Sequence, residues 1–66
     1  MFAIRDKKTK RWVYGTDYTA RPVEQKTSIE KAITYESKSE AEVDFDLRYC
    51  GDGYEIVQVR MTPVIQ

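Results

Sequence analysis

The second half of the chain places a helix start signal and a Gly-rich stop between two strand-like runs. Ser37 and Glu40 have the spacing of a capping box, in which the Ser hydroxyl and the Glu carboxylate satisfy free backbone N–H groups at a helix start. Residues 50–53 end the helical segment, and the run 54–60 that follows is rich in β-branched residues. The order of these signals predicts a β-α-β unit whose first strand is 32–35. A right-handed crossover makes the two strands parallel if they share a sheet.

The helical segment 38–49 has an alternative interpretation as a strand. From residue 43 to residue 49, apolar side chains alternate with Asp or Arg, the period of a strand that would form a hairpin with residues 54–60. A helix is favoured because Asp is disfavoured in strands and because acidic residues suit the first turn of a helix. Val43 and Leu47 then lie off the buried stripe, partly exposed or facing another surface. That stripe would consist of Ala41, Phe45, Arg48 and Tyr49.

The beginning of the chain predicts a hairpin over residues 2–14, with the polar residues 6–10 as its connection. Such a connection often has Gly in the left-handed conformation. Here Thr9 or Lys10 occupies that position, and a residue with a Cβ in the left-handed conformation adds about 1 kcal/mol of local strain. Residues 15–31 show no sustained period and predict a long loop, which in a compact domain is functional or mobile. Within it, residues 16–18 could extend the second strand and residues 28–31 could form one helical turn.

The chain has 66 residues, enough for one small domain over 1–66 with a tail at 62–66. A domain of this size buries only about 60% of its unfolded surface, so its core is marginal without a supplement. Cys50 is the only cysteine, which excludes a disulfide within the chain, and the lack of His argues against a zinc site. Self-association is the remaining way to bury more surface and stabilise the fold, so we expect a dimer or higher oligomer at micromolar concentration.

No apolar run approaches the roughly 18 residues that span a bilayer, and charge follows directly after residues 1–4. The sequence therefore predicts neither a membrane partner nor a secretory signal. A lone cysteine without an export signal suits a reducing compartment. We expect the protein in the cytoplasm of its host cell.

Catalytic chemistry has little support in the sequence. Without His, the usual base that activates Ser or Cys is missing. Cys50 lies near the expected helix end, where the dipole disfavours a thiolate, so we interpret it as a small buried apolar residue. On a helix the side chains of Asp44 and Asp46 point in different directions, so they cannot bind one ion together, and we interpret them as part of a solvent-exposed face. Residues 50–53 lack the Lys and the following helix of a phosphate loop. We therefore predict no enzyme activity, no catalytic, cofactor or metal site, and no small-molecule substrate.

Cations and aromatic rings together make the first hairpin the candidate binding surface. Single-stranded nucleic-acid binders combine the two, because cations neutralise phosphates and rings stack on bases. Alternatively, Trp12 and Tyr14 lie under the helix as core, and the basic turn keeps a strand edge unpaired. Aromatic residues are also typical of protein interfaces, an interpretation open for Tyr14 and Tyr18, whereas Tyr35 and Tyr54 favour core. The candidate surface consists of Arg5, Lys7, Lys8, Lys10, Arg11, Trp12, Tyr14 and Tyr18.

Charge is segregated along a chain whose formal net charge is zero. Residues 1–11 hold five basic side chains and one acidic side chain, whereas residues 36–46 hold five acidic side chains and one basic side chain. Whether the folded molecule is bipolar depends on how the hairpin sits on the helix.

The chain resembles small uncharacterised proteins encoded by phages and prophages of Gram-positive bacteria. The resemblance rests on residues 2–6, the Trp12-Val13 pair, and the blocks 32–42 and 54–57, and it leaves out 15–31. It implies a short accessory protein that acts on host or phage machinery by binding, and it carries over no site residues.

These patterns predict an α+β domain with the order β-β-β-α-β, in which one amphipathic helix packs on a three- to four-stranded mixed sheet. The predicted function is a non-enzymatic accessory binding module that acts by protein–protein interaction or self-association. The alternative is a weak single-stranded nucleic-acid binder that uses the basic hairpin.

Overall fold

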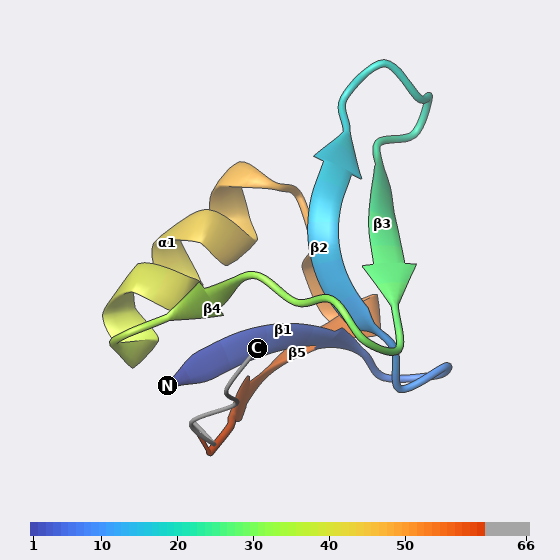
Figure 1. Cartoon of the computed structure of the whole chain (residues 1–66). Helices are drawn as coiled ribbons and strands as arrows, with labels where there is room; N and C mark the ends of the chain where they lie inside the picture. The colour runs from blue at the N-terminus through green and yellow to red at the C-terminus, as the bar shows by residue number, and fades with distance from the viewer. Residues whose placement is uncertain (61–66) are drawn as a thin grey trace.

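The computed structural model describes residues 1–60, so the predicted tail at 62–66 lies outside the described residues. A helix packs against a five-stranded sheet, which confirms the α+β class and the strand–helix–strand order (Figure 1). The elements are β1 (Phe2–Asp6), β2 (Trp12–Asp17), β3 (Glu24–Ser28), β4 (Thr34–Tyr35), α1 (Lys38–Leu47), a short 3-10 turn (Gly51–Gly53) and β5 (Tyr54–Gln58).

Strand β1 is the centre of the sheet. β5 pairs with it along its whole length, while on its other side β4 pairs with its first half and β2 with its end, at Arg5↔Trp12. Every ladder between the described strands is antiparallel. β4 and β5 therefore run in the same direction, as the β-α-β pattern predicts. Because β1 is inserted between them, however, the sheet is antiparallel rather than mixed.

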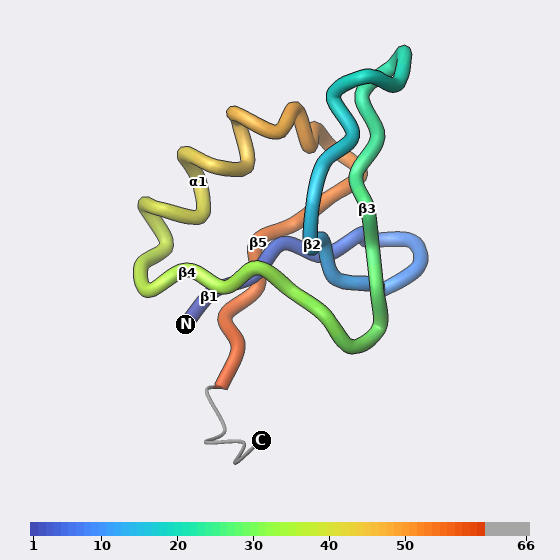
Figure 2. The backbone as a smooth tube through the Cα atoms, turned by 45° about the horizontal axis from the view of Figure 1, so that its top comes forward, coloured from blue at the N-terminus to red at the C-terminus, as the bar shows by residue number. Residues whose placement is uncertain are grey.

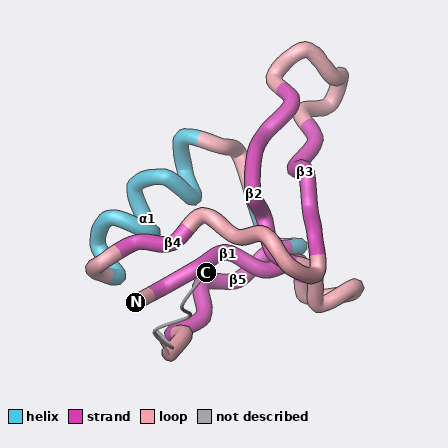
Figure 3. The backbone as a smooth tube through the Cα atoms, in the orientation of Figure 1, coloured by secondary structure: helices cyan, strands magenta, loops and turns pink. Residues whose placement is uncertain are grey.

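The predicted loop over residues 15–31 is wrong for part of its length. β2 continues to Asp17, and β3 pairs with it in a second antiparallel hairpin (Figure 3). β3 reads Glu-Gln-Lys-Thr-Ser, so it has no hydrophobic period from which a strand could be predicted. Backbone pairing with β2 forms it instead. The two strands make an arm, residues 12–28, that rises from the rest of the sheet (Figures 1 and 2).

The core lies between the sheet and α1. Its centre is Ile4, Val13 and Cys50, and both Ile4 and Val13 are only 1% exposed. Ala41 is the fully buried residue of the helix, and its small side chain allows the helix to approach the sheet closely. The partly buried side chains that pack round the centre are Tyr35, Phe45, Tyr54 and Ile56.

Helix α1 begins at its predicted cap. Ser37 has extended backbone angles, and its hydroxyl accepts the Glu40 N–H at 3.2 Å. The helical interpretation of this segment is thereby confirmed over the strand alternative, although the helix ends at Leu47 and not at Tyr49.

We expect Ser37→Ala to lower the free energy of unfolding by about 1 kcal/mol, because the Glu40 N–H loses its acceptor. Urea unfolding followed by circular dichroism measures this change. Ser39→Ala, which changes an exposed Ser of the same helix, is the control and should have little effect. Equal midpoints for Ser37→Ala and the parent protein would contradict the role of this cap.

The end of the helix explains a further difference from the sequence prediction. Tyr49 adopts the left-handed conformation, with φ of 56°. Its N–H donates to the Asp46 carbonyl at 3.1 Å, and the Cys50 N–H donates to the Phe45 carbonyl at 3.2 Å, the paired bonds of a Schellman motif. The turn directs the Tyr49 side chain outward, where it is 71% exposed. Its predicted place on the buried stripe is therefore wrong.

Tyr49→Gly is expected to raise the free energy of unfolding by about 1 kcal/mol, because Gly adopts the left-handed conformation without a Cβ clash. Thermal and urea unfolding both report the change. Tyr49→Ala removes the ring but keeps the strained conformation, so it should give no such gain. A midpoint for Tyr49→Gly at or below that of Tyr49→Ala would show that the left-handed residue costs nothing.

Candidate functional site

The connection between β1 and β2 is organised by Asp6. Its carboxylate accepts the N–H groups of Lys8 and Thr9 at 2.8 and 3.2 Å. Lys10 takes the left-handed conformation, with φ of 64°, as the sequence predicts for this position or for Thr9. With its backbone satisfied in this way, the connection displays four exposed cations, which we call the basic turn: Lys7, Lys8, Lys10 and Arg11.

Arg5 and Trp12 lie side by side behind the basic turn. Arg5 forms an ion pair with Glu55 at 2.6 Å, and its guanidinium lies 5.7 Å from the centroid of the Trp12 ring. Because Arg5 pairs with both Trp12 and Glu55 in the sheet, all three share a face, opposite to the buried face of Ile4 and Val13. Trp12 is therefore half-buried on the face of the sheet opposite to the helix. The hydrogen bond from Arg5 also lowers the pKa of Glu55.

The other two aromatic residues of the predicted surface are exposed. Tyr14 lies two residues beyond Trp12 on β2. Tyr18 lies past the end of β2, where its hydroxyl donates to the Leu47 carbonyl at 3.4 Å. The structure thus brings Arg5 and Trp12 together with the basic turn, and it places Tyr18 beside the helix instead.

A second surface lies on the helix and was not among the predicted site residues. Val43 and Leu47 are 61% and 63% exposed and occupy adjacent turns of α1. Their position off the buried stripe is the only sequence signal of this surface. Three exposed carboxylates of the same helix flank the pair. We call this set the outer helix face: Val43 and Leu47, with Glu40, Glu42 and Asp46.

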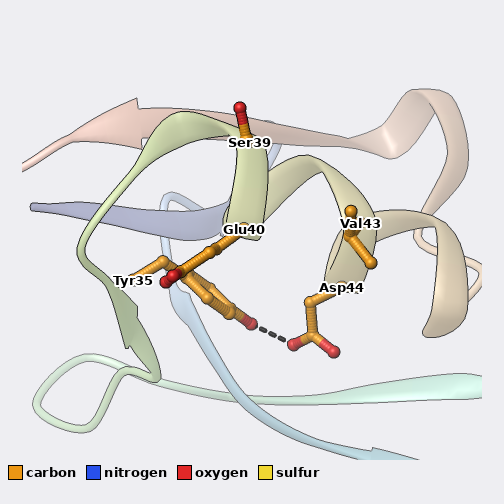
Figure 4. Close-up of a pocket in the computed structure, with 5 residues that line it drawn as sticks. All are labelled: Tyr35, Ser39, Glu40, Val43 and Asp44. Atoms are coloured by element: carbon orange, nitrogen blue, oxygen red, sulfur yellow. Dashed lines mark hydrogen bonds between the residues drawn. The ribbon is translucent and has the colours of Figure 1, made fainter.

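An open, mostly apolar depression of about 480 Å³ adjoins this face (Figure 4). The ring of Tyr35 and the side chain of Val43 contribute its apolar lining, and Asp44 lies at its end. Ser39 and Glu40 complete the lining from the first turn of the helix.

A network of polar side chains joins the helix to the arm. The Asp44 carboxylate accepts hydrogen bonds from the Tyr35 hydroxyl and from Arg48 Nε, the latter at 2.6 Å. The second branch of the Arg48 guanidinium donates to Thr16 Oγ1 at 2.9 Å. Thr16 in turn donates to Gln25 Oε1 at 2.7 Å, and Gln25 Nε2 donates to the Arg48 carbonyl. The network holds the helix end, β4 and the arm in one arrangement.

The pKa shifts in this network have identifiable causes. Burial raises the pKa of Tyr35 to about 12, and the hydrogen bond to Asp44 and the Asp44 charge add to the effect. Burial would also raise the pKa of Asp44, but hydrogen bonds from Arg48 and Tyr35 outweigh it and lower the pKa. The network therefore favours a neutral Tyr35 beside an ionised Asp44.

We expect the Tyr35 shift to make stability depend on alkaline pH. Because its pKa is about 12 in the folded protein and 10.0 for an unperturbed tyrosine, Tyr35 holds its proton more tightly in the folded state. Its contribution is fully present below pH 10 and is lost as the pH rises through about 12. In Tyr35→Phe the free energy of unfolding should fall less steeply over this range. If the free energy of unfolding falls with pH equally steeply in the variant and the parent protein, the pKa of Tyr35 is not raised in the folded state.

Cys50 is buried, and its pKa is raised to about 11, chiefly by burial. This environment is the opposite of the one that activates a thiolate nucleophile. Among residues 1–60, no group of three or more His, Cys, Asp or Glu side chains is placed to hold a metal ion. No helix in the same range is long and apolar enough to cross a membrane.

Comparison of the chain with models of known protein families, with curated proteins and with solved structures finds no match.

Proposed function

We propose that this chain is a non-enzymatic accessory module that binds another polypeptide through the outer helix face. The observation that carries the proposal is the exposure of Val43 and Leu47. At water-facing helix positions the fold gains little from apolar side chains. The same side chains would each contribute about 1.5–3 kcal/mol if a partner buried them completely.

The surroundings of the pair also suit an interface. Tyr18 lies beside Leu47, and the depression beside Val43 offers space for a side chain of the partner. The carboxylates supply the polar rim that typically surrounds an apolar interface centre. Because the cap at Ser37 and the Arg48 network fix the helix, binding would require little ordering of this surface.

Site-specific photocrosslinking tests the proposal and also identifies the partner. A benzophenone amino acid at position 47 should give a discrete adduct in the producing cells, and its mass should identify the bound chain. The control position is Lys31, which is exposed in the connection between β3 and β4. No adduct from position 47, or the same adduct from position 31, would refute binding by the outer helix face.

Single-stranded nucleic acid is the second candidate ligand, and one observation favours it. Trp12 lies behind the basic turn on the sheet face opposite to the helix, and a ring beside cations is the combination that a stacking platform uses. Opposing this role, Arg5 covers Trp12 and is paired with Glu55. If three or four cations bind phosphates, log affinity should fall with log salt at a slope of roughly −2 to −3. Anisotropy titrations of the parent protein and of Lys7→Glu/Lys8→Glu with a labelled oligonucleotide measure this slope. Micromolar binding at physiological salt, lost in the variant, would establish this function.

A further inference from the structure

We propose that the partner of the outer helix face is the basic turn of a second copy of this chain, so that the protein associates head to tail. The inference rests on the proposed function and names the bound polypeptide.

The two surfaces carry opposite charges, and their charged side chains form no ion pair within the described residues. The ion pairs among residues 1–60 are Arg5–Glu55 and Arg48–Asp44, and neither uses a cation of the basic turn or a rim carboxylate of the outer helix face. The basic turn has four exposed cations, and the rim of the helix has three exposed carboxylates, with Glu36 also exposed before the helix. The chain thus displays both halves of a complementary pair.

The fold places these halves on different sides of the molecule. Figures 1 and 2 both show the β1–β2 connection at one side and α1 at the other. The molecule is therefore bipolar in space as well as in sequence. With a Debye length of about 8 Å at physiological salt, most of the attraction between the two surfaces of one molecule is screened. Each surface is left free to pair with a neighbouring molecule.

Apolar burial adds to the charge complementarity. The long stems of Lys and Arg in the basic turn can cover Val43 and Leu47 while their charged ends meet the rim carboxylates. The core of the monomer is small, with only Ile4 and Val13 as fully buried large side chains among the described residues. Apolar surface buried between two molecules would therefore add substantially to the stability of the folded chain.

Because the two surfaces differ, the contact is heterologous, and it produces rings or open chains of protomers. Sedimentation equilibrium of the purified protein should therefore show an average mass that rises with concentration from micromolar to millimolar. Raising the salt from about 0.05 M to about 0.5 M should weaken the association at least tenfold, because exposed ion pairs are screened. A monomer at all concentrations in low salt would overturn the inference, while an adduct from position 47 to a different protein would leave the proposed function standing.

A charge exchange identifies the surfaces. Lys7→Glu/Lys8→Glu brings the four side chains of the basic turn from a charge of +4 to zero, and Glu42→Lys/Asp46→Lys brings the three rim side chains from −3 to +1, so each variant alone should remain monomeric. An equimolar mixture should associate, because the unchanged basic turn of the helix variant can bind the unchanged acidic rim of the turn variant. Lys26→Glu/Lys31→Glu changes net charge as the turn variant does but touches neither surface, and it should associate like the parent protein. Association of either surface variant alone, or failure of the mixture to associate, would overturn the assignment.

Discussion

Ile4→Ala is expected to remove a large part of the stability of the protein at 25 °C. Ile4 is 1% exposed on the central strand β1, opposite Ile56 of β5, and it belongs to the cluster with Val13 and Cys50. Truncating a buried Ile to Ala typically costs about 2–5 kcal/mol. At about 0.05–0.15 kcal/mol per residue, a chain of this length has a total stability of only about 3–10 kcal/mol. One core side chain thus represents much of the available stability.

The matched control is Ile29→Ala, which removes the same atoms from a side chain that is 71% exposed. It should change the free energy of unfolding by less than about 0.5 kcal/mol. Urea unfolding followed by Trp12 fluorescence measures both variants at one protein concentration, because self-association would make stability concentration-dependent. If Ile4→Ala unfolds at the same urea concentration as Ile29→Ala, the core does not lie where the structure places it.

The sequence predicts the elements whose signals are local. The cap at Ser37 depends on a hydrogen bond to Glu40, three residues away, and Lys10 adopts a strained conformation because its own connection requires it. In both cases the residues that determine the structure are close together in the chain. The hairpin of β1 and β2 and the start of α1 could therefore be predicted without tertiary information.

The elements that depend on distant pairing could not be predicted in this way. β3 contains only polar residues and exists because β2 offers it a backbone partner. The insertion of β1 between β4 and β5 pairs residues that are 31–33 positions apart in the chain for β4 and 48–56 positions apart for β5, and no pattern within any of these segments specifies it. The outward position of Tyr49 follows from where the helix ends, which its apolar character does not predict.

The candidate site likewise combines features that neighbouring residues determine with features that depend on distant pairing. Exposure of the basic turn follows from a polar connection between two strands, and the sequence predicts it. Trp12 lies on the sheet face opposite to the helix because Arg5 is its partner in the sheet, and the sequence does not specify that register. The outer helix face is defined by which side of α1 packs on the sheet. The sequence predicts Ala41 and Phe45 on the buried stripe, with Val43 and Leu47 either partly exposed or facing another surface, and the structure shows that the latter two are exposed.

Arg48→Met is expected to lower the free energy of unfolding by about 2 kcal/mol and to loosen the arm. The guanidinium is the donor that links Asp44 to Thr16, and the Arg48 and Asp44 side chains are only 20% and 25% exposed. Hydrogen bonds to charged groups contribute about 1.5–3 kcal/mol, and the partial exposure of this pair favours the lower half of that range. Met keeps the apolar stem of the side chain, so the variant isolates the polar contribution.

The distinguishing measurement is amide hydrogen exchange in β3. The guanidinium donates to Thr16, which in turn donates to Gln25 of β3, so its loss should speed exchange in the arm more than in β1 and β5. The bond from Gln25 to the Arg48 backbone carbonyl is kept in the variant. Arg48→Lys should not restore the parent behaviour, because one ammonium group lacks the planar fork that reaches both Asp44 and Thr16. Arg21→Met, which replaces an exposed Arg in the connection between β2 and β3, is the control and should be close to neutral. If Arg48→Met and Arg21→Met show the same stability and the same exchange in β3, the network does not anchor the arm to the helix.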